Sequence, residues 1–163
     1  MPQDHRAVVV TASDGAASGN RDDASGPAVA EVLTAAGFDV VGRDVVFDDR
    51  DAIAEVLRRR IDDEDAELVV VTGGTGFGPR DVTPEATRDV IERDAPGLAE
   101  AMRAAGRGHT PMADLSRGVC GIRGRALVLN LPGSPRGAVE SIEAVIAVLP
   151  HALALLGGDT THH

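Results

Sequence analysis

The chain alternates short apolar runs with longer segments in which apolar residues recur every three or four positions. The runs are nearly continuous and rich in β-branched residues, which is typical of strands buried on both faces of a parallel sheet. They predict four strands, at Ala7–Thr11, Val40–Phe47, Leu68–Thr72 and Ala126–Leu131. The segments with the helical period predict helices at Pro27–Ala36, Asp51–Ile61, Pro84–Arg93, Leu98–Ala105 and Val139–Leu149, then a terminal stretch through Leu156.

Alternating strands and helices predict an α/β fold with three layers, in which a mostly parallel sheet has helices on both faces. The length of 163 residues and the hydrophobic content of 43% suit one continuous core. We therefore expect a single domain over residues 1–163, with residues 157–163 as a frayed tail. Because ligands of open parallel sheets bind beyond the carboxyl ends of the strands, the loops that follow the strands should meet at one crevice.

Charge and composition narrow the classes of function. The formal net charge is −10 and every basic residue except the histidines is arginine. Such a chain repels a bare duplex, and an aromatic content of 2% leaves few platforms for stacking unpaired bases, so we expect no nucleic-acid partner. An acidic, lysine-free surface indicates either a protein that works in concentrated salt or a coding sequence biased towards arginine, and both readings stay open.

The sequence shows no pattern typical of a disulfide framework, a histidine metal site or a membrane-spanning segment. Cys120 is the one cysteine, and its apolar neighbours favour a small core residue. The histidines show no metal-ligand spacing. The first residues lack the apolar run of a signal peptide, and no segment approaches transmembrane length, so we expect a cytoplasmic protein without a membrane partner.

The strongest chemical signal is a glycine-rich turn between the third predicted strand and the helix at Pro84. Its residues are Thr72, Gly73, Gly74, Thr75 and Gly76. Glycines allow the backbone to approach a ligand closely, and N–H groups, hydroxyls and a helix N-terminus together can surround a phosphate. The same residues can also form a merely structural connection. The spacing matches neither the P-loop nor the Rossmann glycine pattern.

Carboxylates follow two of the predicted strands. Asp48 and Asp49 close the second strand, and Asp81 lies just beyond the glycine turn. Two carboxylates with phosphate oxygens suit Mg²⁺, which prefers oxygen ligands and keeps several waters. A helix-capping role is the alternative for Asp49. The pairs Asp22-Asp23 and Asp62-Asp63 lie in polar segments and are interpreted as solvated.

Two further loops complete the expected ring around the crevice. Pro132, Gly133 and Ser134 follow the last predicted strand and precede a helix, and Ser13 follows the first strand. The Pro132–Ser134 loop can form a second anion cradle at a helix N-terminus. A purely structural turn would use the same residue types, so this signal is weak by itself.

Four segments together closely resemble the Mog/MoaB family of molybdenum-cofactor biosynthesis, which includes the G domain of gephyrin. They are Thr72–Gly76, Pro79–Ala86, Leu115–Arg117 and Asn130–Ser134. The resemblance extends from about the first strand to the last helix. Ala95–Gly97 and Val119–Gly124 are especially similar to the Mog and gephyrin branch.

The resemblance implies a molybdopterin adenylyltransferase, which uses Mg-ATP to attach AMP to the terminal phosphate of molybdopterin and releases pyrophosphate. It implies that Asp48 and Asp81 are catalytic and hold Mg²⁺ through the substrate phosphates. The family usually has proline where this chain has Phe47, so Asp49 stays an alternative to Asp48. The implied substrate-binding residues are Ser13, Thr72, Gly73, Gly74, Thr75, Gly76, Thr83, Glu85, Ser116, Arg117, Pro132, Gly133 and Ser134.

This reaction requires no general base, because a phosphate monoester is already ionised near neutral pH. Charge neutralisation would fall to Mg²⁺, backbone N–H groups and arginines such as Arg80 or Arg117. The implied partners are molybdopterin, ATP, a transient downstream molybdate-inserting protein, and further copies of the chain in a trimer or hexamer. Two alternatives are a non-catalytic molybdopterin-binding or scaffold protein of the MoaB branch, and a domain acting on another nucleotide or pterin, as in competence-damage-type proteins.

Overall fold

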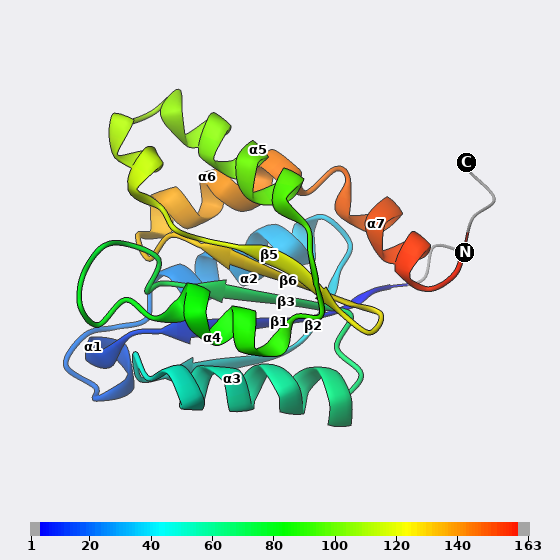
Figure 1. The fold of residues 1–163 in the computed structure, drawn as a ribbon, viewed down its shortest axis with the longest axis horizontal. Helices are drawn as coiled ribbons and strands as arrows, with labels where there is room; N and C mark the ends of the chain where they lie inside the picture. The colour runs from blue at the N-terminus through cyan, green and yellow to red at the C-terminus, as the bar shows by residue number, and fades with distance from the viewer. Residues whose placement is uncertain (1–3, 160–163) are drawn as a thin grey trace.

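A computed structural model describes residues 4–159 and is built around a six-stranded sheet (Figure 1). The strand order is β2-β1-β3-β6-β5-β4. The parallel strands are β1 (Arg6–Ala12), β2 (Asp39–Val46), β3 (Leu68–Thr72) and β6 (Ala126–Leu131). β5 (Cys120–Arg123) runs antiparallel to β6, and β4 (Arg93–Asp94) runs antiparallel to β5. The predicted mostly parallel sheet is confirmed.

Helices cover both faces of this sheet, which confirms the predicted three-layer α/β fold (Figure 1). On one face lie α2 (Ser25–Ala35), α5 (Pro96–Arg107), α6 (Pro135–Val145) and α7 (Leu149–Leu156). On the other lie α3 (Arg50–Arg58) and α4 (Thr83–Val90). Shorter elements are α1 (Asp14–Ala17), the π-helical turn η1 (Arg59–Asp63) and the 3₁₀ helix η2 (Pro111–Leu115).

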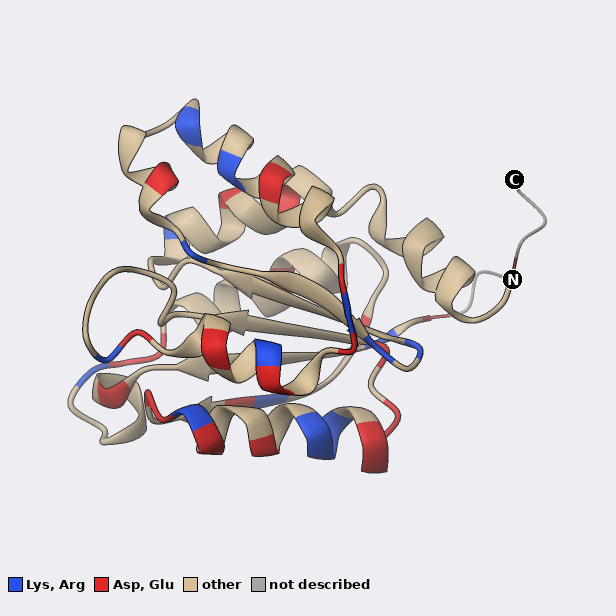
Figure 2. Cartoon of the chain, viewed as in Figure 1, with Lys and Arg blue, Asp and Glu red and all other residues tan. Residues whose placement is uncertain are grey.

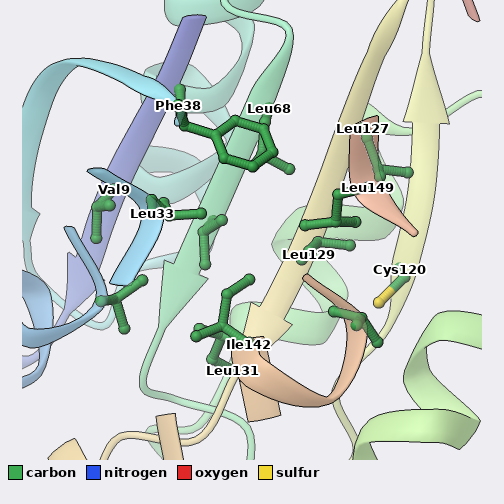
Figure 3. Packing of buried hydrophobic residues seen from close by; sticks show 14 of the residues in the cluster. Val9, Leu33, Phe38, Leu68, Cys120, Leu127, Leu129, Leu131, Ile142 and Leu149 are labelled. Carbon is green, nitrogen blue, oxygen red and sulfur yellow. The ribbon is translucent and has the colours of Figure 1, made fainter. Parts of the chain in front are cut away.

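The core consists of two apolar layers because side chains alternate across each strand. In β1, Val9 packs towards α2 and α6, while Val8 and Val10 pack towards α3 and α4. All five residues of β3 are buried. Figure 3 shows the larger layer, where Leu33 of α2 and Ile142 of α6 lie against the strands. Burial on both faces explains the nearly continuous apolar runs of β1, β3 and β6. For β2 the expectation of burial on both faces was wrong, because β2 lies at the edge of the sheet and none of its residues is fully buried.

Two strands at one edge of the sheet were not predicted. The expected helix Pro84–Arg93 ends at Val90, and Arg93–Asp94 forms β4 instead. The Glu92 N–H donates to the Ile122 carbonyl, so the chain pairs with β5 where a helix would have continued. This pairing joins segments far apart in the sequence. Neither short strand has enough apolar residues for a sequence pattern to predict it.

Several helices begin earlier than the sequence predicts. α6 begins at Pro135, before the expected start at Val139, and Ser134 caps it. α2 begins at Ser25, two residues before Pro27, and has no side-chain cap. The helix expected over Val139–Leu149 is divided into α6 and α7, which meet at a bend of 63°.

In the described part of the chain, no single helix is long and apolar enough to cross a membrane, although the bent pair α6 and α7 together meets the length and composition requirement. Of the predicted tail, the first three residues follow α7, and the Gly157 N–H donates to the Leu153 carbonyl. Residues 160–163 lie outside the described residues.

The parallel strands end at the same edge of the sheet, on the left in Figure 1. Thr72 at the end of β3 lies opposite Thr11 of β1 and Leu131 of β6. Ala12 of β1 lies opposite Val46 of β2. The loops after these four strands therefore start side by side, as the sequence predicts.

Candidate active site

The glycine turn is tied to the loop after β6. The Thr72 hydroxyl donates to the Pro132 carbonyl at 2.6 Å, and the Gly73 N–H donates to the Leu131 carbonyl at 3.0 Å. Gly73 has a φ of 101°, and a Cβ there would clash with the Ala12 carbonyl oxygen. Only glycine combines this backbone conformation with so close an approach to β1. The turn thus lies directly against the ends of its two neighbouring strands.

Two hollows open on either side of this turn and share Gly74, Asp81, Gly133 and Ser134. We call them the apolar lobe, of about 520 Å³, and the acidic lobe, of about 470 Å³. The walls of the apolar lobe include Phe77, Ala99, Met102, Ala113 and Leu115. The walls of the acidic lobe include Ser13, Asp22, Asp23, Asp48 and Thr72. The crevice predicted from the strand ends is therefore a two-lobed space with the glycine turn at its middle.

Asp48 lines the acidic lobe and is held through one carboxylate oxygen. Its Oδ2 accepts the Asp14 N–H at 2.9 Å, and Oδ1 of Asp14 accepts the Asp48 N–H at 3.0 Å. Burial raises the pKa of the Asp48 carboxyl, and the negative charges of Asp14 and Asp81 act in the same direction, against the hydrogen bond from Asp14. No hydrogen bond from the described residues reaches Oδ1 of Asp48, which is left for a ligand.

Asp81 is arranged in the same way from the other side of the turn. Its Oδ2 accepts the Gly78 N–H at 2.9 Å, and no described residue donates to its Oδ1. Each aspartate therefore offers one uncommitted oxygen to the crevice. Within residues 4–159 no group of three or more His, Cys, Asp or Glu side chains could enclose a metal ion. Two single carboxylate oxygens fit Mg²⁺, which takes its remaining ligands from water and substrate phosphates.

Asp49 occupies a different position. Its side chain accepts the Ala52 N–H at 2.8 Å and caps the N-terminus of α3. It is exposed and lies in the wall of neither lobe. The capping alternative considered for Asp49 is thus what the structure contains.

Arg117 clamps the glycine turn from outside. Its Nε donates to the Gly76 carbonyl and its Nη2 to the Asp81 carbonyl, both at 2.8 Å. The same guanidinium pairs with Glu85 at 2.7 and 3.2 Å, and this pairing lowers the pKa of the Glu85 carboxyl. Neither Arg117 nor Glu85 is in the wall of a lobe. Their contacts shape the turn and the backbone beside Asp81.

Arg80 is likewise paired. Its Nε and Nη2 each donate to the Asp14 carboxylate at 3.0 Å, and this bidentate contact lowers the pKa of Asp14. Asp14 in turn exchanges hydrogen bonds with Asp48. Arg80 therefore reaches Asp48 through Asp14. Figure 2 shows that basic and acidic residues also lie near one another along α3.

The remaining predicted residues divide between lining and buried positions. Thr75, Gly76, Ser116 and Pro132 line the apolar lobe. Ser13 and Ser134 line the acidic lobe and cap α1 and α6 with their hydroxyls. Thr83 is fully buried and lies in the wall of neither lobe.

Sequence reasoning missed the far wall of the apolar lobe. Ala99, Met102 and Arg103 come from α5, and Ala113 comes from η2. Arg103 donates to the carbonyls of Ser116 and Gly118, which fixes the segment that faces the turn. No local motif marks these residues, because helical periodicity gives the buried side of α5 without saying which ligand space it borders.

Asp14 and Asp23 were undervalued for a similar reason. The sequence shows Asp23 in a polar loop, but the Thr11 hydroxyl donates to its carboxylate at 3.0 Å and the Gly26 N–H does so at 3.0 Å. These bonds fold the loop before α2 onto the end of β1 and form one side of the acidic lobe.

A mostly parallel open sheet with a glycine turn, two lobes and two aspartates that each keep one carboxylate oxygen without a protein donor is an arrangement typical of proteins that bind phosphate-bearing small molecules beyond their strand ends. Residues 8–151 match the family described as probable molybdopterin binding domain, and the chain belongs to that family.

Named relatives agree with this placement. The chain is 40% identical to a molybdopterin adenylyltransferase of Helicobacter pylori, over 93% of this chain and 87% of the relative. It is 43% identical to the molybdenum cofactor synthesis protein cinnamon of Drosophila melanogaster, but spans 26% of that longer protein. Among solved structures, the molybdopterin biosynthesis enzyme MoaB of Thermus thermophilus is 52% identical, with a TM-score of 0.90 over 95% of this chain and 98% of that one.

Proposed function

We propose that this protein is a molybdopterin adenylyltransferase of molybdenum-cofactor biosynthesis. The observation that carries the proposal is the two-lobed crevice, whose halves meet at Gly74, Asp81, Gly133 and Ser134. A reaction that joins two phosphate-bearing molecules needs one space for the ring system of each molecule. The two spaces must meet where the phosphates of the two molecules react. The adenylyltransferase relatives that match almost the whole chain support the same reading.

In this reaction a phosphate oxygen of molybdopterin forms a bond to the α-phosphorus of ATP. The bond from that phosphorus to the bridging oxygen of pyrophosphate breaks, and pyrophosphate carries the electron pair away. The attacking phosphate is already ionised, so no side chain has to remove a proton. The work of the protein is to place the two phosphates in line and to stabilise their charge.

Gly74 of the glycine turn and Ser134, which caps the N-terminus of α6, line both lobes. Backbone N–H groups of the turn and of the first turn of α6 would bind the converging phosphates there. Arg80 and Arg117, which the sequence suggests as neutralising cations, already pair with Asp14 and Glu85. We assign them to positioning: Arg117 fixes the turn, and Arg80 orients Asp14 and through it Asp48.

Asp48 and Asp81 would hold Mg²⁺ together with the substrate phosphates, each through its uncommitted Oδ1. When bound, the ion would add positive charge beside the acidic side chains of the crevice, where it would offset the charge of the phosphates. Asp48 rather than Asp49 is assigned this role, because Asp49 is committed to capping α3.

The test is incubation of the purified protein with molybdopterin and Mg-ATP, followed by detection of adenylyl-molybdopterin and pyrophosphate. Formation of both products in equal amounts is expected. The 52% identity to a protein titled MoaB keeps one alternative, a molybdopterin-binding or scaffold protein without catalysis. Binding of molybdopterin without either product would favour that alternative and reject the transferase.

The cellular location, the oligomeric state and the downstream partner of the protein are part of the same proposal. We propose a cytoplasmic homo-oligomer, a trimer in the first instance and a hexamer as the alternative, which passes its product to a molybdate-inserting protein. Mass measurement in solution distinguishes the two assemblies, and a monomer would reject both.

A further inference from the structure

Thr83, the first residue of α4, has a buried hydroxyl that no described residue uses. The residue is fully buried, and its Oγ1 makes no hydrogen bond with any other described residue. Buried polar atoms in folded proteins nearly always have a partner, because an unmatched one loses its water without compensation. A methyl group in the same place would avoid that cost.

The orphaned hydroxyl lies next to the candidate catalytic centre. The Thr83 N–H donates to the Gly74 carbonyl at 3.1 Å, which joins α4 to the glycine turn. A Cβ on Gly74 would clash with Oγ1 of Thr83 and would stand 3.2 Å from Oδ1 of Asp48. The hydroxyl and the uncommitted oxygen of Asp48 therefore flank the same side of the Gly74 α-carbon.

We propose that Thr83 is a positioning residue whose hydroxyl donates a hydrogen bond to Oδ1 of Asp48 when ligand occupies the crevice. The proposal rests on the role assigned above to Asp48. A carboxylate oxygen has room for more than one partner, so Oδ1 accepts this bond while it also contacts a ligand. With Oδ2 fixed by the Asp14 N–H, the bond from Thr83 would leave the carboxylate one orientation.

The placement explains why a hydroxyl without a partner among the described residues is present at this position. Carboxylates that bind metal ions are commonly held by a second layer of hydrogen bonds, and loss of such a bond lowers affinity or activity about 10- to 100-fold. Thr83 is suited to this because it is rigidly buried, β-branched and bound to the turn through its own backbone.

Thr87, one turn later in α4, provides a matched control. It is also fully buried, but its Oγ1 accepts a hydrogen bond from Nδ2 of Asn130 at 2.8 Å. Replacement of either threonine by valine removes one hydroxyl from the same helix. The two changes differ because only Thr87→Val removes a hydrogen bond between described residues, the one from the Asn130 amide.

The first measurement is the melting temperature of the full chain without ligand. Thr83→Val should raise the Tm by about 2–4 °C, because an unmatched hydroxyl is replaced by a methyl group. Thr87→Val should lower the Tm by a similar amount, because the Asn130 amide loses its acceptor. If Thr83→Val lowers the Tm as Thr87→Val does, the hydroxyl has a structural partner and the proposal is wrong.

The second measurement is function at saturating molybdopterin and Mg-ATP. Thr83→Val should reduce kcat about 10- to 100-fold and raise the KM for Mg-ATP, with little change in the KM for molybdopterin, and Thr83→Ser, which retains the hydroxyl, should restore most of the rate. Unchanged kcat in Thr83→Val, or a Thr83→Ser variant as slow as Thr83→Val, would overturn the assignment.

A third measurement separates this proposal from the proposed function. The rise in Tm produced by Mg-ATP alone should be smaller for Thr83→Val than for the unmodified protein and for Thr83→Ser, because the bond to Asp48 forms only in the occupied crevice. This readout needs no turnover, so it decides the role of Thr83 even if the protein proves to bind without catalysing. An equal rise in all three proteins would reject the positioning role.

Discussion

The two lobes of the crevice have nearly equal volumes but different chemistry. Asp22, Asp23 and Asp48 line the acidic lobe alone, and Asp81 lines both lobes. The wall of the apolar lobe includes alanine, methionine, leucine and phenylalanine side chains, together with Arg103 and Glu140. A surface of carboxylates suits a metal ion with phosphates, and an apolar wall suits a flat ring system. The difference indicates that the acidic lobe suits the metal ion and phosphates, whereas the apolar lobe selects a ring system by its shape.

The lobes also differ in how they are built. The acidic lobe forms at the ends of β1, β2 and β3, where parallel strands bring their following loops together. The apolar lobe needs α5, η2 and α6 to close around the turn. Exposed Phe77, Met112 and Leu115 stand at its rim. One lobe is thus a product of sheet topology, and the other depends on helix packing.

The largest expected effect is in the acidic lobe. Asp81→Asn and Asp48→Asn should each lower kcat about a thousandfold or more, because a neutral amide cannot supply the negative oxygen needed to hold Mg²⁺ with the phosphates. Steady-state assays with molybdopterin binding measured in parallel check this. Asp49→Asn is the matched control: asparagine caps helices as well as aspartate, so Tm and turnover should both be retained. Loss of turnover in Asp49→Asn alone would reverse the assignment.

A smaller effect is expected at Arg117, which lies in the wall of neither lobe and binds the backbone of the glycine turn. Arg117→Ala removes the donors to the Gly76 and Asp81 carbonyls and leaves Glu85 without its partner. We expect kcat to fall about 10- to 100-fold and the Tm to fall by several degrees, and Arg117→Lys should rescue little because lysine lacks the planar fork. The control is Arg50→Ala, which breaks the exposed pair with Asp89 and should cost about 1 kcal/mol or less. If Arg117→Ala and Arg50→Ala change kcat and Tm equally, the Arg117–Glu85 ion pair is an ordinary surface pair without a role in positioning the turn.

The apolar lobe is tested by filling it. Ala113→Phe adds an aromatic ring to the wall contributed by η2. We expect the KM of one substrate to rise about tenfold or more while the KM of the other stays within about twofold, since only one ring system enters this lobe. Ala113→Ser controls for the change of residue without the added volume. Equal weakening of both substrates would contradict the division of the crevice into two separate lobes.

The smallest effect concerns the charge of the whole molecule rather than either lobe. With a net charge of −10, repulsion among carboxylates should decrease as salt screens it, so the Tm should rise between about 0.1 M and about 2 M KCl. Differential scanning fluorimetry measures this directly. A constant or falling Tm would mean that the arginine ion pairs lose as much by screening as the carboxylates gain, and would favour coding bias as the origin of the lysine-free composition.

The sequence predicted the acidic lobe better than the apolar one for a physical reason. Asp48 lies just beyond the end of β2 and Asp81 lies in the loop after β3, and parallel strands must end at a common edge, so their proximity follows from two local patterns. Met102 and Ala113 become neighbours of the turn only through helix packing, and no local pattern records that. β4 and β5 were missed in the same way, because non-local pairing created them.

The amino-acid sequence by itself determined the α/β class, the four parallel strands and the glycine turn, because burial on both faces and close backbone approach leave local traces in residue type. Only the tertiary structure separated Asp48 from its neighbour Asp49. One lies in the acidic lobe and the other caps α3. It also placed Thr83 out of reach of solvent beside Asp48. These distinctions depend on which groups meet across loops, and that is fixed by packing rather than by spacing along the chain.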